Sequence, residues 1–168
     1  MHQILAYAAA LHDSIDHKYM VQGDSKLSTT EVIAKEFNNR FGGGGDELIQ
    51  IISNISWSQH QKGMAKPLSD ESRDWLRLIV RDADWIDAID IERCKEYSRK
   101  KLGMKDEMII HQRAVEHAHE KLLLIYDKLH FQVSKEIALI PHQELVNYLS
   151  HPLVTSSLLH LHQSTTQE

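Results

Sequence analysis

Histidine, carboxylate and amine side chains gather in one short stretch near the start of the chain. An apolar segment with the composition of a buried helix, residues 4–11, leads directly into His12, Asp13, Asp16 and Lys18. Burying such groups without partners costs about 2–7 kcal/mol each. The stretch therefore either turns out into solvent at once, or its groups pair with a metal ion or with one another.

A second set of carboxylates lies far downstream, in the apolar helical run of residues 79–89. Asp84 has apolar residues one helical turn to either side, whereas Asp82 points to a different face of the helix. Asp84 is thus the carboxylate most enclosed by apolar neighbours and the one most in need of a cation. The simpler interpretation is a salt bridge between Asp84 and a neighbour such as Arg81.

These two stretches resemble the HD superfamily of metal-dependent phosphohydrolases. The signature of that family is a His, then an adjacent His-Asp pair, then a distant Asp, which together hold a divalent metal. The pair corresponds to His12-Asp13, and the distant acid corresponds to Asp84.

Three further motifs make the chain similar to the small bacterial HD hydrolases, some of which are nucleotide pyrophosphohydrolases. Their HD-x-x-D-x-K-[FY] string is matched by residues 12–19, and their Ile-Ser segment by residues 54–57. Their His-x-x-Glu-Lys-Leu-Leu string is matched by residues 117–123. The resemblance covers the chain from about Leu5 to Leu129.

The resemblance implies an all-α HD-domain bundle of about seven or eight helices, with a divalent cation held by His12, Asp13 and Asp84. Histidine and carboxylate ligands suit Mn, Mg, Fe, Co, Ni or Zn. Such an ion polarises a phosphoryl oxygen and lowers the pKa of bound water towards neutrality. The resemblance therefore predicts a phosphohydrolase that acts on a nucleotide or a related phosphate ester or anhydride.

Other residues receive roles around that predicted centre. Asp16 and Asp87 are expected to position or activate water, and Lys18 to offer a point charge to a phosphate. The further residues expected to bind the phosphate are His117, Lys121 and Arg81. Taken singly, each has a simpler interpretation, such as an exposed helix residue or a surface ion pair.

The chain departs from the family pattern at its first ligand. The family's first His lies well upstream of the His-Asp pair, but 11 residues precede His12 and His2 is too close to replace it. The sequence therefore leaves a second function open, a truncated HD fold that serves as a binding or regulatory module without catalysis. A missing helix would also expose apolar surface, so a homodimer is expected.

Composition narrows the class of protein. A length of 168 residues predicts one domain, residues 1–162, followed by a polar tail, residues 163–168. A net charge of -5 does not favour binding to nucleic acid. The single cysteine, Cys94, excludes an internal disulfide and favours the cytoplasm. No apolar run is long enough to predict a membrane span.

Hydrophobic periodicity predicts helices and no strand. A loop is expected at residues 58–68, and residues 57–64 within that region are either a lid over a site or a solvated loop. The four glycines 42–45 are interpreted as a connector between two helices. The alternative, which their context favours less, is a loop that binds phosphate. The expected helices are residues 3–12, 28–41, 46–55, 69–89, 90–100, 106–130, 134–140 and 142–149.

Overall fold

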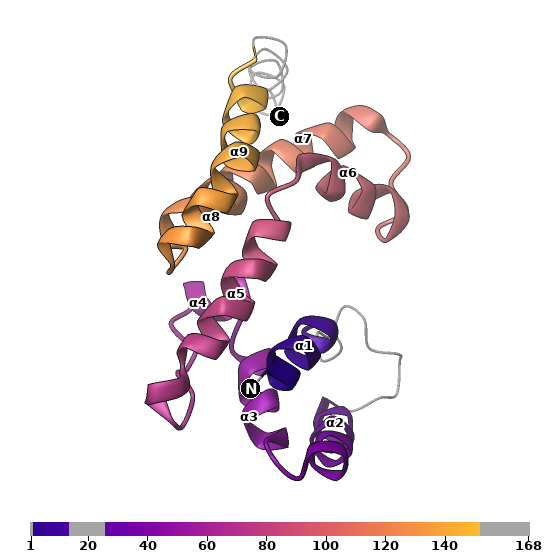
Figure 1. The fold of residues 1–168 in the computed structure, drawn as a ribbon. Helices are drawn as coiled ribbons and strands as arrows, with labels where there is room; N and C mark the ends of the chain where they lie inside the picture. The colour runs from indigo at the N-terminus through magenta and orange to yellow at the C-terminus, as the bar shows by residue number, and fades with distance from the viewer. Residues whose placement is uncertain (1, 14–25, 152–168) are drawn as a thin grey trace. The chain divides into compact units, whose positions relative to one another are not determined.

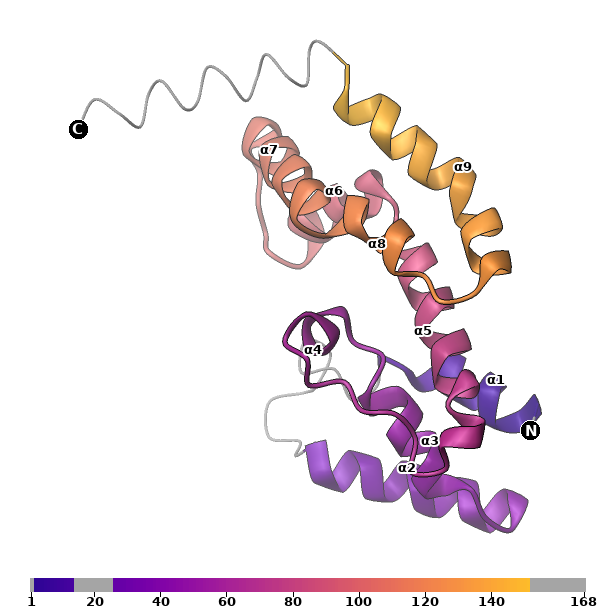
Figure 2. The same ribbon diagram turned by 90° about the vertical axis from the view of Figure 1, so that its left-hand side faces the viewer.

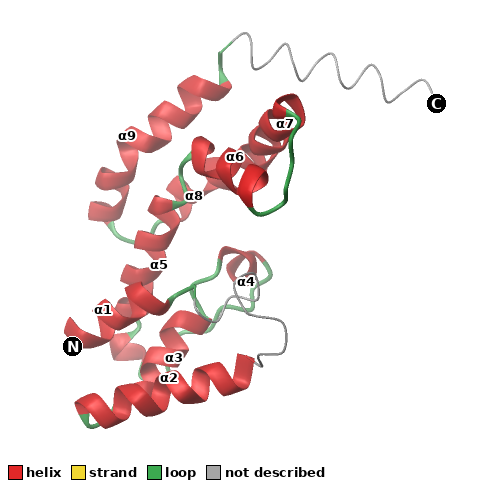
Figure 3. Cartoon of the chain, turned by 90° about the vertical axis from the view of Figure 1, so that its right-hand side faces the viewer, coloured by secondary structure: helices red, strands yellow, loops and turns green. Residues whose placement is uncertain are grey.

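The computed structural model describes residues 2–13 and 26–151, and within these ranges every regular element is helical (Figure 3). The all-α prediction is therefore confirmed. The chain divides into two compact units, residues 1–84 and 85–168, and each is described by itself (Figure 1). The predicted polar tail, residues 163–168, lies outside the described residues.

The first unit is built from five helices and one short 3-10 turn. Its elements are α1 (His2–Leu11), α2 (Lys26–Phe41), α3 (Gly45–Ser53), α4 (Trp57–Gln61), η1 (Glu71–Arg73) and α5 (Trp75–Asp87), whose last three residues belong to the second unit. Figure 2 shows α1 and α2 lying against α3.

The core of the first unit is an apolar cluster to which all the longer helices contribute. Its buried members are Ile4, Ala8, Phe37, Leu48, Ile51, Ile52, Ile55, Leu68, Leu76 and Val80. The aromatic rings of Tyr7, Phe37 and Phe41 extend this core, with centroids 4.7 to 5.4 Å apart. This packing joins α1 to α5 and so determines where the residues that follow α1 lie.

The glycine run connects α2 to α3 and lets the two helices approach closely. Gly42, Gly43 and Gly44 all have positive φ, which residues with a side chain rarely adopt. Gly45 donates its N–H to Asn38 Oδ1 at 2.8 Å, and a Cβ at this position would lie 2.3 Å from the carbonyl oxygen of α2 that faces it. The glycines thus serve the turn and the helix crossing.

A short set of polar contacts holds the segment before α5 against α3. The N–H of Lys66 donates to Asn54 Oδ1 at 3.0 Å, and the N–H of Ser69 donates to Gln50 Oε1 at 2.9 Å. The N–H of Leu68 donates to Asp74 Oδ1 at 2.8 Å. These bonds fix the start of α5 and hence the direction in which this helix carries Asp84.

Two predictions about this region were wrong. Residues 58–68 were expected to form a loop, but α4 takes up this stretch as far as Gln61 and buries Trp57, and only residues 62–68 are without a helix. A single helix was expected from Ser69, but Asp70 caps the short η1 turn instead, by accepting from the N–H of Ser72 at 3.1 Å. A turn of this kind satisfies backbone groups locally, which helical periodicity does not reveal.

The second unit continues with three longer helices. Its elements are the end of α5, α6 (Ile91–Lys100), α7 (Glu107–His117), a π-helical segment η2 (Ala118–Leu122), α8 (Leu123–Lys128) and α9 (Gln132–Leu149). The carboxylates of Asp90 and Asp106 cap α6 and α7. Because α7, η2 and α8 follow one another without a break, the described residues hold eight separate helices, in agreement with the seven or eight predicted.

The prediction that Pro141 separates two helices was also wrong, because α9 runs through it. A proline inside a helix removes the hydrogen bond to the carbonyl four residues earlier. That residue, Ile137, is 61% exposed, so this turn of α9 lies at the surface. Among the described helices, none is long and apolar enough to cross a membrane.

The close crossing of α2 and α3 predicts that Gly45→Ala destabilises the protein. The added Cβ would collide with the backbone of Ala34, and such overpacking costs about 1–3 kcal/mol. At a helical position without this contact the same substitution stabilises by about 0.4–1 kcal/mol. Urea unfolding monitored by circular dichroism distinguishes destabilisation from stabilisation. A stabilised variant would contradict the close crossing of α2 and α3.

Candidate functional site

His12 is oriented by the end of α1. Its Nδ1 lies 2.7 Å from the carbonyl oxygen of Ala9, one turn earlier. An Nδ1–H that donates to this carbonyl leaves Nε2 as the ring atom that faces the remaining neighbours. Backbone anchoring of one imidazole nitrogen is the arrangement by which proteins orient histidines that bind metals.

Nε2 of His12 meets two carboxylates. It lies 3.5 Å from Asp13 Oδ2 and 3.3 Å from Asp84 Oδ1. The side chains of His12, Asp13 and Asp84 are 27%, 49% and 29% exposed, so the cluster is open to small molecules from solvent. The structure thus brings together the three residues that the sequence assigned to a metal, from helices far apart in the chain.

The two carboxylates change the charge state of the histidine. The hydrogen bond that His12 donates to Asp84 contributes most, the Ala9 carbonyl and the charge of Asp13 add to it, and partial burial opposes them; together they raise the pKa of His12 from 6.5 to about 9. With no metal bound, His12 is therefore an imidazolium at neutral pH, paired with both carboxylates.

Asp84 does not form the simpler pair with Arg81. The guanidinium of Arg81 donates to Asp82 Oδ1 from Nη2 at 2.8 Å and from Nε at 3.3 Å, and both residues are buried. The role of Arg81 in phosphate binding stays a prediction, and its guanidinium is already engaged by this carboxylate. The buried pair lies directly before Asp84 on α5.

The donor set suits a divalent cation in part. Ligands bound at about 2.0–2.2 Å to one ion lie about 3.0–3.4 Å from one another. The separations of 3.3 and 3.5 Å around Nε2 are close to that range. Within the described ranges, however, no group of three or more His, Cys, Asp or Glu side chains is arranged to hold a metal ion. In the structure the cluster is an ion-paired triad.

The remaining predicted site residues fall in other parts of the chain. Asp16 and Lys18 lie outside the described residues. Asp87 belongs to the second unit, where its carboxylate is largely exposed and pairs with Arg93. The roles given to these residues stay predictions.

His117 and Lys121 lie at the start of the π-helical segment of the second unit and within it. His117 is exposed at the end of α7, and Lys121 is half-buried within η2. Their role in phosphate binding stays a prediction. Helical periodicity does not reveal the π-helical segment, and π-helical turns often occur at functional sites.

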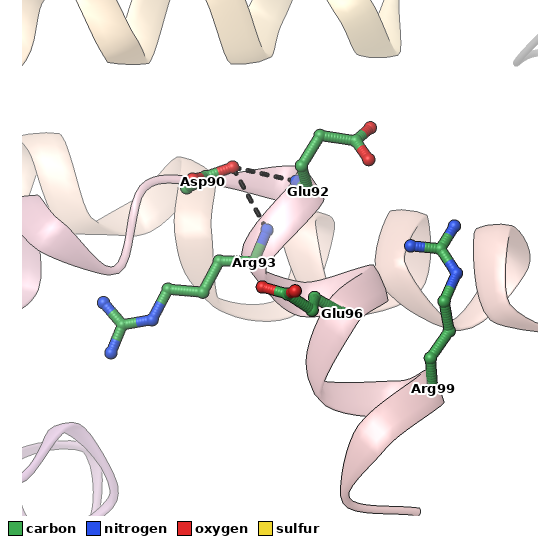
Figure 4. Close-up of a pocket in the computed structure, with 5 residues that line it drawn as sticks. All are labelled: Asp90, Glu92, Arg93, Glu96 and Arg99. Atoms are coloured by element: carbon green, nitrogen blue, oxygen red, sulfur yellow. Dashed lines mark hydrogen bonds between the residues drawn. The ribbon is translucent and has the colours of Figure 1, made fainter. Parts of the chain in front are cut away.

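The second unit also carries a surface pocket on α6 (Figure 4). Its lining residues are Asp90, Glu92, Arg93, Glu96 and Arg99. Several of these groups already have structural partners: Asp90 caps the helix, and Arg99 donates to Glu107 at 2.6 Å. The charges of the pocket therefore mostly stabilise α6 and its junction with α7.

The orienting carbonyl of Ala9 was missed by the sequence analysis. A histidine that follows the last turn of a helix can bond the free carbonyl three residues earlier, so its position after an apolar helix is the signal that would have found it.

Comparison with protein-family models, curated proteins and solved structures gave no significant match.

The triad predicts an unusual titration of His12 in the metal-free protein. NMR titration should give a pKa of about 9, and Asp84→Asn should move it back towards 6.5 because the strongest contact is weakened. Since the pKa is raised by folding, the stabilisation by His12 is complete below about pH 6.5 and is lost as the pH rises through about 9.

The matched control is Asp46→Asn, which removes an exposed carboxylate of the same unit outside the triad. It should leave the titration of His12 unchanged. A wild-type His12 that titrates near 6.5 would contradict the ion-paired triad.

Proposed function

We propose that this protein is an HD-type, metal-dependent phosphohydrolase that acts on a nucleotide or a related phosphate ester or anhydride. The observation that supports it is that the carboxylates of Asp13 and Asp84 both lie within 3.5 Å of Nε2 of His12. Two helices separated by most of the first unit contribute these groups, and the motif order of the family gives the same three residues.

In this proposal Nε2 of His12 and the carboxylates of Asp13 and Asp84 hold a divalent cation. When bound, such an ion neutralises phosphoryl charge and makes a bound water acidic enough to act near neutral pH. The Ala9 carbonyl keeps the imidazole in the tautomer that presents Nε2. Because His12 must lose its proton to bind a cation, binding strengthens as the pH rises.

The substrate is held by positive charge in a protein whose net charge is negative. We assign phosphate contacts to Lys18, His117 and Lys121, and the positioning of water to Asp16 and Asp87, by their place in the family motifs. A nucleotide is the preferred substrate class for the same reason. We also propose that the protein is cytoplasmic, in keeping with the free thiol of Cys94. We further propose that it assembles as a homodimer.

A second candidate function is a binding or regulatory module without catalysis. The ion-paired state of the triad favours it, since a charged His12 between two carboxylates is satisfied without a metal. In that case the triad serves to join the end of α1 to α5.

Hydrolysis assays separate the two functions. Wild-type protein incubated with nucleoside triphosphates and Mn²⁺ should release phosphate or pyrophosphate, and Asp84→Asn should reduce the rate by about 100-fold or more because a ligand to the cation is lost. Asp46→Asn is the control and should keep the wild-type rate. Circular dichroism confirms that each variant is folded.

Two results count against hydrolysis. Folded wild-type protein that releases no phosphate with any of Mn²⁺, Mg²⁺, Fe²⁺, Co²⁺, Ni²⁺ or Zn²⁺ would support the module instead. Activity that survives Asp84→Asn unchanged would place the chemistry elsewhere in the chain.

A further inference from the structure

A chain of polar side chains in the second unit links three helices and includes none of the residues of the triad. Tyr148 of α9 lies at its centre, and its hydroxyl is 2.9 Å from Nδ1 of His111 on α7. Nζ of Lys95 on α6 lies 4.9 Å from the centroid of the Tyr148 ring and donates to Glu92 at 2.6 Å. We call these four residues the α9 relay.

The relay is partly shielded from solvent. The side chain of Lys95 is 12% exposed, and His111 and Tyr148 are half-buried. The rings of His111 and Tyr148 meet edge to face, with centroids 5.9 Å apart. A polar group that loses its partner here is not fully compensated by water, so breaking one bond of the relay costs free energy.

The charges around His111 keep it neutral. Burial and the charge of Lys95 lower the pKa of His111 below its usual 6.5, and Glu92 offsets part of this. Burial opposes the charge of Lys95, but its bonds to Glu92 and Tyr148 outweigh burial and raise the pKa of Lys95. The relay therefore pairs a fixed cation with an imidazole that does not share its charge.

The hydrogen bond between α7 and α9 depends on the protonation state of His111. The Tyr148 hydroxyl and Nδ1 of a neutral His111 share one hydrogen bond, and the tautomer of the imidazole decides which of the two atoms donates. Protonation of His111 makes both ring nitrogens donors, so a bond in which Nδ1 accepts has to reverse. It also brings a second positive charge next to Lys95.

We propose that the α9 relay is an acid-sensitive latch, which fastens the C-terminal end of α9 to α6 and α7 and opens when His111 takes up a proton. The charged and titratable groups that face His111 are Lys95 and Glu92 from α6 and Tyr148 from α9. Glu92 offsets only part of the effect, because the charge of Lys95 acts more strongly on His111 than that of Glu92 does.

Release is confined to one end of α9. The earlier part of the helix is held to α8, where the rings of Tyr126 and His142 stack 4.6 Å apart and Ala138 is fully buried. Beyond His142, the inward-facing residues are Leu145 and Leu149, and Tyr148 supplies the polar connection. Opening the latch therefore loosens residues 143–149 while α8 and the start of α9 keep their packing.

Amide hydrogen exchange tests the latch on the full chain. Protection factors, corrected for intrinsic exchange, are measured at about pH 7.5 and about pH 5, on either side of the histidine range. In wild-type protein the protection of residues 143–149 should fall by about threefold or more at the lower pH, because His111 binds a proton more readily in the open state. Residues 48–53 of α3 serve as the internal reference and should not change.

Two variants assign the effect to His111. His111→Gln supplies an acceptor for the Tyr148 hydroxyl that cannot be protonated, so protection of residues 143–149 should become independent of pH. His119→Gln, which removes an exposed histidine of the π-helical segment, should keep the wild-type pH dependence. If His111→Gln keeps it as well, a different group controls the end of α9 and the latch is wrong.

NMR titration gives a readout that does not depend on how the variants fold. The midpoint for loss of protection in wild-type protein should follow the titration of His111, which should lie below 6.5, and not that of His142. Unchanged protection across the range, or a His111 that titrates at or above 6.5, would overturn the proposal.

Discussion

The ion pair between His12 and Asp84 is the contact on which the proposed site depends. Each group would be costly to bury alone, and together they neutralise one another at the junction of α1 and α5. The pair forms because the apolar core beneath it, with Ile4 and Ala8 from α1 and Leu76 from α5, holds the two helices together. Loss of that packing would separate the groups.

Polar contacts of Arg77 hold helix α5 in place. Arg77 donates to Asp74 at 2.7 and 2.8 Å and to the carbonyl of Asn54 at 3.3 Å, which ties the first turns of α5 to the end of α3. A site built on such a rigid element holds its ligand geometry better than one built on a loop.

Much of the fold and part of the site could be predicted from the sequence. The apolar surroundings of Asp84 indicated that it needs a cation, and the structure gives it His12. Helix boundaries failed where local contacts override periodicity: α9 continues through Pro141, and Asp70 caps a short turn where one continuous helix was expected. The π-helical segment leaves no mark in residue spacing, so it could not be predicted.

The most direct test of the account is the number of Mn²⁺ ions bound by each chain, measured by isothermal titration with elemental analysis after dialysis. If His12, Asp13 and Asp84 share a cation, wild-type protein binds one ion per chain, Asp84→Asn loses it, and Asp46→Asn keeps it. Wild-type protein that binds no ion, or Asp84→Asn protein that binds as well as wild type, would show that the triad is an ion pair and not a metal centre.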